Sequence, residues 1–250
     1  MRRGWLNGCP RRTTTKKTRF EQPLYTIADA ARIVAVPPST LATWAKGYVR
    51  RSADRVDVAG DPIVTWLPAA RPQEPSIPFV GLAEALVLAA VRRSGVPLQR
   101  VRPALAHLQR EIGLDHALAS RRLFTDGAEV LFDYGEAGAE RTRDDVKQLV
   151  VVRSGQRVFS DVVQDYLRRI QYADDGYARL IRVPGYRRAE VVADPERAFG
   201  APIFERGGAR VDDVLQRFWA GDSLDDLTRE FGIPADQLED VLRVASRRAA

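Results

Sequence analysis

The chain has 250 residues, of which 45% are hydrophobic and 29% are charged. This length favours two or three modest domains, and this composition excludes a disordered polymer because it can fill ordinary cores. The single cysteine, Cys9, excludes an internal disulfide framework and fits a reducing compartment. The most apolar run, residues 82–91, is too short to span a bilayer and contains Glu84. We therefore expect a soluble, cytoplasmic protein that does not enter membranes.

The positive charge is concentrated at one end of the chain. There are 39 basic and 33 acidic side chains in all, which gives a net charge of +6. Residues 1–70 hold 12 basic and 5 acidic side chains, and the rest of the chain is nearly neutral. Concentrated basicity raises the local potential and favours polyanions such as nucleic acid.

The N-terminal region predicts two short helices joined by a turn. Residues 1–23 are polar, basic and aperiodic, and we expect them to form a flexible tail. Thr26 then caps a helix with apolar residues at helical spacing, which a Pro-Pro pair ends. Ser39 caps a second helix, which ends at Gly47.

A wing and a linker are predicted next. Residues 51–66 contain two short β-prone runs around Gly60, as a wing hairpin would. Residues 67–78 contain four prolines and predict a linker, most clearly over residues 71–78. Residues 24–70 therefore predict a winged helix-turn-helix domain.

Residues 79–175 predict a middle domain of helices and hairpins. Apolar residues at helical spacing predict helices over residues 82–89 and 98–112. An Asp-Gly pair predicts a hairpin over residues 121–134, and a Ser-Gly pair predicts another just before a helix capped by Ser160. The apolar stripes of the first two helices fit either a dimer interface or packing within one chain.

The last part of the chain, residues 176–250, predicts a third domain. Short β-prone runs are followed by three amphipathic helices, of which the last two, within residues 223–245, are joined at a glycine. The predicted fold is thus α+β and mostly helical. It has an N-terminal winged helix-turn-helix, a helical and hairpin middle, and a small C-terminal domain of strands and three helices.

The N-terminal helix-turn-helix has the composition that DNA binding requires. The second helix of such a motif enters the major groove while flanking basic residues hold phosphates. Here that helix has no acidic residue. The residues expected near base edges are Ser39, Thr40, Thr43 and Lys46, and those expected on phosphates are Arg50, Arg51 and Arg55.

The C-terminal helix-turn-helix outline has the opposite charge. Residues 201–240 hold 10 acidic side chains against four arginines. We expect Asp236, Glu239 and Asp240 to face outward, where carboxylates would repel phosphates. This surface fits contact with a basic protein, or a solvated face with no partner.

The N-terminal segment resembles the MerR-like family of winged helix-turn-helix regulators over roughly 45 residues. The residues that carry the likeness are Tyr25-Thr26-Ile27, Ala30, Val36, Thr40-Leu41, Trp44 and Gly47. The family usually has arginines flanking the Thr-Leu pair, where this chain has Ser39 and Ala42. More of the affinity for DNA would then come from Lys46, Arg50, Arg51 and the N-terminal tail.

From about Ala189 onward the chain resembles domain-of-unknown-function family 433. Pro202-Ile203 and residues 208–211 match the family's strand element, and the helices that follow match as well. With both of these matches, the chain resembles a VapB-like antitoxin of a bacterial toxin–antitoxin pair. That resemblance implies a partner, a PIN-type ribonuclease toxin, and the leading hypothesis is an antitoxin that represses its own operon and binds this toxin. We assign no individual toxin-contact residues.

No constellation of residues points to catalysis or to a metal. His107 and His116 have no nearby histidine or cysteine partner in the sequence. Acidic residues gather in the middle of the chain, at Asp126, Glu129, Asp133 and Glu136, but turn chemistry explains the first of them. We therefore expect no enzyme activity, no catalytic residues, no metal and no cofactor.

Two other functions remain open. A MerR-like transcription regulator without a toxin would use the middle domain to sense a ligand, and a pure interaction scaffold would not bind DNA. We expect a homodimer, because paired half-sites multiply the weak affinity of a single module for operator DNA.

Overall fold

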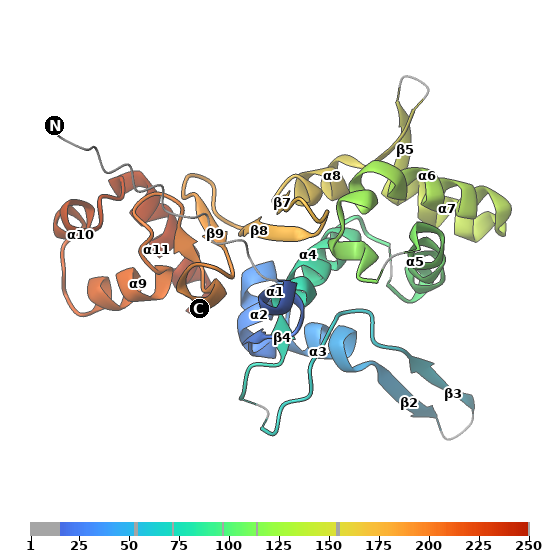
Figure 1. The fold of residues 1–250 in the computed structure, drawn as a ribbon, viewed down its shortest axis with the longest axis horizontal. Helices are drawn as coiled ribbons and strands as arrows, with labels where there is room; N and C mark the ends of the chain where they lie inside the picture. The colour runs from blue at the N-terminus through green and yellow to red at the C-terminus, as the bar shows by residue number, and fades with distance from the viewer. Residues whose placement is uncertain are drawn as a thin grey trace, which may run out of the picture.

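The computed structural model describes residues 16–52, 55–71, 73–96, 98–113, 115–153 and 156–249. For residues 49–52, 55–58, 98–101, 153, 156–158 and 248–249, the backbone alone is described. The fold is α+β and mostly helical, as predicted (Figure 1). No helix among these residues is long and apolar enough to cross a membrane.

The N-terminal part contains the predicted helix-turn-helix. Helix α1 (Lys16–Phe20) and strand β1 (Pro23–Tyr25) precede α2 (Ile27–Val34) and α3 (Pro38–Lys46). Strands β2 (Tyr48–Ser52) and β3 (Arg55–Gly60) form an antiparallel hairpin, the wing, which projects from the body of the molecule (Figure 1). Helix α1 and the start of β1 lie in the segment that we expected to be a flexible tail.

Helix α4 is the centre of the molecule. It spans Phe79–Arg93, and its residues from Phe79 to Val91 are all buried. Short strand β4 (Ile77–Pro78) leads into it and pairs with β1, so the proline-rich segment ends in a strand of the fold. Helices α1, α2 and α8 all pack against α4, which brings separate parts of the chain into one hydrophobic core.

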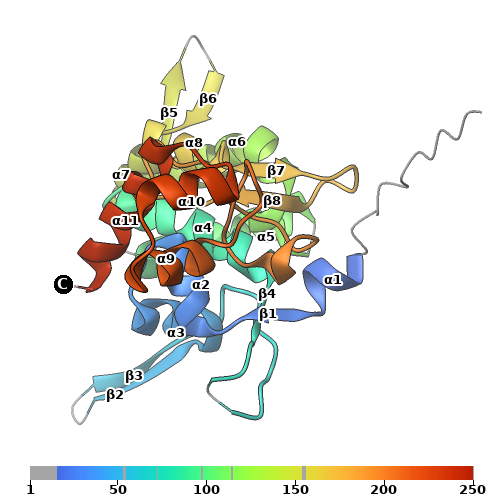
Figure 2. The same ribbon diagram turned by 90° about the vertical axis from the view of Figure 1, so that its left-hand side faces the viewer.

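The middle of the chain continues with α5 (Leu98–Ile112), η1 (Ala117–Ala119), α6 (Arg121–Ala137) and α7 (Glu140–Leu149). Strands β5 (Val150–Arg153) and β6 (Gln156–Phe159) form the predicted second hairpin, and α8 (Asp161–Leu167) follows it. The hairpin projects from the opposite side of the molecule to the wing (Figure 2).

The hairpin predicted over residues 121–134 is wrong, because these residues lie in the long helix α6. Gly127 is needed there for packing rather than for a turn. A Cβ atom on Gly127 would lie 2.9 Å from Leu123 Cδ1 and 3.3 Å from the ring of Phe159. A glycine that allows close packing has the same sequence signature as a turn glycine.

The C-terminal part contains the predicted strands and three helices. Four strands form an antiparallel sheet in the order β10-β9-β8-β7, and their bounds are Ile170–Tyr172 (β7), Ala178–Arg182 (β8), Val191–Ala193 (β9) and Ile203–Phe204 (β10). A short turn, η2 (Ala198–Gly200), lies between β9 and β10. Helices α9 (Val211–Trp219), α10 (Leu224–Phe231) and α11 (Ala235–Ala249) follow. The division of the chain into domains at residues 70, 78 and 175 stays a prediction.

Candidate DNA-binding surface

Local sequence fixes the first helix and the turn of the motif. The Thr26 hydroxyl oxygen accepts from the Asp29 backbone N–H at 3.1 Å, and the hydroxyl donates to the Asp29 carboxylate at 2.7 Å. This is the predicted N-cap. At the other end, Ala35 has a left-handed conformation with φ 57°, and the Val36 N–H donates to the Ala31 carbonyl at 3.0 Å. The chain therefore turns sharply into α3.

The second helix of the motif begins two residues earlier than predicted. Its N-cap is Pro37, with Pro38 at the first helical position, so the predicted cap at Ser39 is wrong. Proline fits this position because its fixed φ suits the first turn and its missing N–H is not needed there. Leu41, Trp44 and Ala45 are buried, which holds α3 against the core by its inner face.

The wing begins where α3 ends. Gly47 has φ +72°, and a Cβ atom on it would lie 2.5 Å from the carbonyl oxygen of Gly60. Tyr48 pairs with Gly60, so Gly60 closes the base of the wing. The prediction that Gly60 forms the hairpin's turn is wrong, because Gly60 is the last residue of β3 and the two strands lie on either side of residues 53–54.

The predicted base-reading residues all lie on α3. Ser39 and Lys46 are exposed, whereas Thr40 and Thr43 are partly buried. Two of the four also make contacts within the chain. The Thr43 hydroxyl donates to the Ser39 carbonyl at 2.9 Å, and Lys46 Nζ lies 5.8 Å from the centre of the Trp66 ring.

The predicted phosphate-contacting residues lie on the wing. Arg50 and Arg51 belong to β2, and Arg55 begins β3. Their side chains lie outside the described residues. Their contacts with DNA therefore stay a prediction.

Three further arginines lie beside the motif and were not predicted from the sequence. Arg92 and Arg93 end α4, and Arg102 is on α5. Arg102 donates to the Asp61 carbonyl and lies 5.5 Å from the centre of the Tyr48 ring, at the base of the wing. The signal that could have revealed them is the absence of acidic residues from positions 85–110.

A buried polar network supports the segment that follows the wing. Glu84 of α4 is 3% exposed, and its carboxylate accepts from the Thr65 backbone N–H at 2.6 Å. The other oxygen of Glu84 lies 3.0 Å from His116 Nδ1, which is also 2.8 Å from the Thr65 hydroxyl. The hydrogen bond between His116 and the Glu84 carboxylate raises the pKa of His116 against the opposing effect of burial. These contacts fix the chain between the wing and α4.

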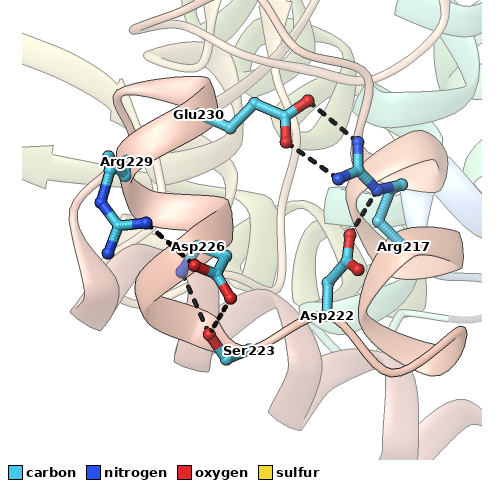
Figure 3. A network of polar contacts seen from close by, with 6 residues as sticks. All are labelled: Arg217, Asp222, Ser223, Asp226, Arg229 and Glu230. Carbon is cyan, nitrogen blue, oxygen red and sulfur yellow. Dashed lines mark hydrogen bonds and ion pairs between the residues drawn. The ribbon is translucent and has the colours of Figure 1, made fainter.

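Carboxylates of the C-terminal helix-turn-helix outline are paired within the domain (Figure 3). Both guanidinium amino groups of Arg217 lie 2.9 Å from Glu230 oxygens, and Arg217 also contacts Asp222. Asp226 accepts from Arg229 at 2.9 Å and from the Ser223 hydroxyl at 2.6 Å. Part of the negative charge counted in the sequence is therefore paired with arginines of the same domain.

The expectation that Asp240 faces outward is wrong, whereas Asp236 and Glu239 are exposed. Asp240 is 3% exposed. One carboxylate oxygen of Asp240 accepts from the backbone N–H groups of Arg187, Arg188 and Ala189, at 2.6, 2.7 and 3.1 Å. It is buried because it binds the loop before β9, a role that helical periodicity does not reveal.

No group of three or more histidine, cysteine, aspartate or glutamate side chains suited to a metal occurs among the described residues. Asp126, Glu129, Asp133 and Glu136 follow one another along α6 at spacings of three and four residues. This spacing places them on one face of the helix.

Comparison with known proteins shows the family. A model described as "Putative DNA-binding HTH domain" matches residues 23–105, and one described as "Protein of unknown function (DUF433)" matches residues 191–245. "Putative antitoxin VapB45" of Mycobacterium tuberculosis (strain ATCC 25618 / H37Rv) is 50% identical over 226 residues, which is 90% of this chain and 94% of that protein. The chain belongs to the same family as "Putative antitoxin VapB45".

A solved structure and a second curated protein, both of Mycobacterium tuberculosis, extend the comparison. The crystal structure of Rv2018 has a TM-score of 0.79 and 46% identity, over 90% of this chain and 99% of that one. "Uncharacterized protein Rv2308" of the same strain as VapB45 is 28% identical over 230 residues, which is 89% of this chain and 90% of that protein. The likeness therefore runs through nearly the whole chain and is not confined to the helix-turn-helix.

Proposed function

We propose that the protein is a DNA-binding antitoxin that represses its own operon and neutralises a PIN-type ribonuclease toxin by direct binding. The observation that carries the proposal is the helix-turn-helix of α2 and α3, whose second helix has no acidic residue and is followed directly by strand β2, which holds Arg50 and Arg51. The name of the VapB45 relative supports the antitoxin part. The protein would act in the cytoplasm.

In this proposal α3 enters the major groove, with Ser39, Thr40, Thr43 and Lys46 near base edges. The wing arginines, Arg50, Arg51 and Arg55, lie along the phosphates. The C-terminal domain binds the toxin, through residues that we do not assign. A MerR-like homodimer would pair two such modules on a two-fold operator.

Binding to DNA is tested with the DNA immediately upstream of the protein's own coding sequence. The variant K46A/R50A/R51A should bind this DNA more weakly. It should also reduce the slope of log affinity against log salt concentration by roughly 2 to 3, because each lost phosphate contact contributes about 0.9 to that slope. The control R141A/K147A/R168A removes the same charge from exposed sites on α7 and at the C-cap of α8. Equal affinity of the two variants would mean that α3 and the wing do not bind DNA.

The antitoxin part is tested separately by co-expression with the product of the neighbouring gene. A stable complex and relief of growth arrest are expected. If the protein binds its upstream DNA but forms no such complex, it is a transcription regulator without a toxin. If it forms the complex but binds no DNA, the repression part of the proposal is wrong.

A further inference from the structure

Two stretches of the chain that contain no acidic residue meet beside α3, the second helix of the motif. The first, residues 30–53, covers the end of α2, the turn, α3 and β2, and the second, residues 85–110, covers most of α4 and α5. The second stretch carries five arginines. Helix α4 packs against α2, so its C-terminal end lies next to the turn of the motif.

Contacts between side chains show how the two stretches meet. The Arg92 guanidinium donates to the Thr40 hydroxyl oxygen at 3.0 Å, and Arg93 donates to the Ala35 carbonyl at 3.5 Å. Thr40 lies in the first turn of α3, and Ala35 is the left-handed residue that ends α2. The two arginines therefore contact both sides of the turn in the helix-turn-helix.

The ordinary role of arginine at a helix C-terminus does not account for the places of the Arg92 and Arg93 guanidinium groups. Arginine there interacts favourably with the helix dipole and can hydrogen-bond the last carbonyl groups. Three of the last four carbonyls of α4 already have partners, because Ser94 N–H donates to the Ala90 and Val91 carbonyls and Gly95 N–H donates to the Arg92 carbonyl. The guanidinium groups instead extend away from α4 to the motif.

Both arginines also remain available to an anion. Each is exposed, and neither forms an ion pair with a carboxylate among the described residues. Arg93 packs on the ring of Tyr166, whose centre is 5.6 Å from the guanidinium carbon, and this contact limits its freedom. An exposed arginine held in one place, beside a helix that has no acidic residue, is suited to a backbone phosphate.

We propose that the C-terminal end of α4 is a second part of the DNA-binding surface, in which Arg92 positions Thr40 and both Arg92 and Arg93 bind backbone phosphates. This inference rests on the proposed function. The inference adds contacts with DNA phosphates that lie outside α3 and the wing. Arg92 is a positioning residue for base recognition, because it fixes the hydroxyl of Thr40 rather than touching a base.

The phosphate contacts are tested by measuring affinity for the upstream DNA over a range of salt concentrations. R92A and R93A should each weaken binding about tenfold and lower the salt dependence of log affinity by about 0.9, as loss of one phosphate contact does. R229A is the control, because Arg229 is 75% exposed on α10 in the C-terminal domain. Thermal unfolding of each variant checks that the fold is kept.

The positioning role is tested with a double-mutant cycle between Arg92 and Thr40. The quantity measured is the ratio of affinities for the upstream DNA and for a duplex of scrambled sequence. T40V and R92A should each reduce this ratio, and the double variant should reduce it no further than T40V alone. If the two substitutions reduced the ratio by independent factors that multiply in the double variant, Arg92 would not act through Thr40.

The outcomes separate this inference from the proposed function. If the wild-type protein binds the upstream DNA but R92A and R93A behave like R229A, only the inference is wrong. If the wild-type protein has no specific, salt-sensitive affinity for that DNA, the DNA-binding proposal and this inference both fail.

Discussion

Asp240 shows how one buried charge organises the C-terminal domain. Burial disfavours its charged form, but the backbone N–H groups of Arg188, Ala189 and Arg187, with Arg243 adding, outweigh burial and lower the pKa of Asp240. A lowered pKa in the folded state stabilises the fold at pH values above the ordinary pKa of aspartate, about 3.9. That stability is lost as the pH falls through the lowered pKa.

Asp240→Asn should therefore destabilise the protein by roughly 2–3 kcal/mol at neutral pH, because three hydrogen bonds in a buried place change from a charged to a neutral acceptor. The difference from wild type should shrink as the pH falls to about 3. Chemical denaturation at a series of pH values measures this difference. Asp236→Asn, one helical turn away and exposed, is the control, and equal effects of the two changes would contradict the role of Asp240.

The Glu84–His116 pair has the opposite dependence on pH. The pKa of His116 is raised in the folded state, chiefly by its hydrogen bond with Glu84. Its contribution to stability is therefore complete below the ordinary histidine pKa, about 6.5, and is lost as the pH rises through the raised pKa.

Glu84→Gln should lower the pKa of His116 toward 6.5 and destabilise the protein at pH 6 by about 1–3 kcal/mol, because a charge-assisted hydrogen bond becomes neutral. The loss should be smaller at pH 8. A titration followed by NMR measures the pKa directly, with the ring of His107 as an internal control. If the pKa of His116 were the same in the variant as in the wild type, Glu84 would not be the cause of the raised pKa.

Among elements, helices and strands with regular apolar spacing could be predicted from the sequence. Helices α2, α4, α5 and α9–α11 and hairpin β5–β6 were confirmed. Glycines caused the errors, because Gly127 and Gly60 serve close packing and not turns. The site residues on α3 could be proposed from local pattern, whereas Arg92 lies 52 positions from Thr40, and a local pattern holds no information on such a contact.

Gly47→Ala should disturb the wing more than an ordinary glycine substitution. The alanine would have an unfavourable positive φ, and its Cβ would contact the carbonyl of Gly60 at 2.5 Å. We expect a loss of roughly 2–4 kcal/mol in stability, since backbone strain and a backbone clash add. Gly176→Ala is the matched control, because φ is +82° there and no atom lies within 4 Å of the new Cβ. Urea denaturation compares the two, and equal losses would mean that the clash does not matter.

In the whole molecule, the N-terminal residues are joined to distant parts of the chain. Arg19, with a side chain 3% exposed, forms an ion pair with Asp175 and donates to the Ala178 carbonyl at 3.2 Å. The hydroxyl of buried Tyr25 donates to the Gly200 carbonyl at 2.9 Å, and burial, with Asp194 adding, raises the pKa of Tyr25. On α2, Arg32 lies 3.6 Å from Asp212 of α9. The helix-turn-helix and the C-terminal domain are thus in direct contact.

Arg19→Ala should destabilise the protein by roughly 1–3 kcal/mol, because the buried guanidinium of Arg19 donates to the Ala178 carbonyl and pairs with Asp175, whose side chain is 38% exposed. Lys17→Ala, exposed on the same helix, should change stability by less than about 0.5 kcal/mol. Thermal unfolding measures both. A small effect of Arg19→Ala would show that α1 contributes little to the fold.

The contact between Tyr25 and Gly200 also sets an order of events during synthesis. The two residues are 175 positions apart. At about 5–20 residues per second, the ribosome adds the second roughly 10–35 s after the first. Through that interval the Tyr25 hydroxyl, on the strand that leads into the helix-turn-helix, lacks its acceptor, and Arg19 lacks Asp175 for nearly as long. The nascent N-terminal segment therefore waits for the far end of the chain before it acquires its final surroundings.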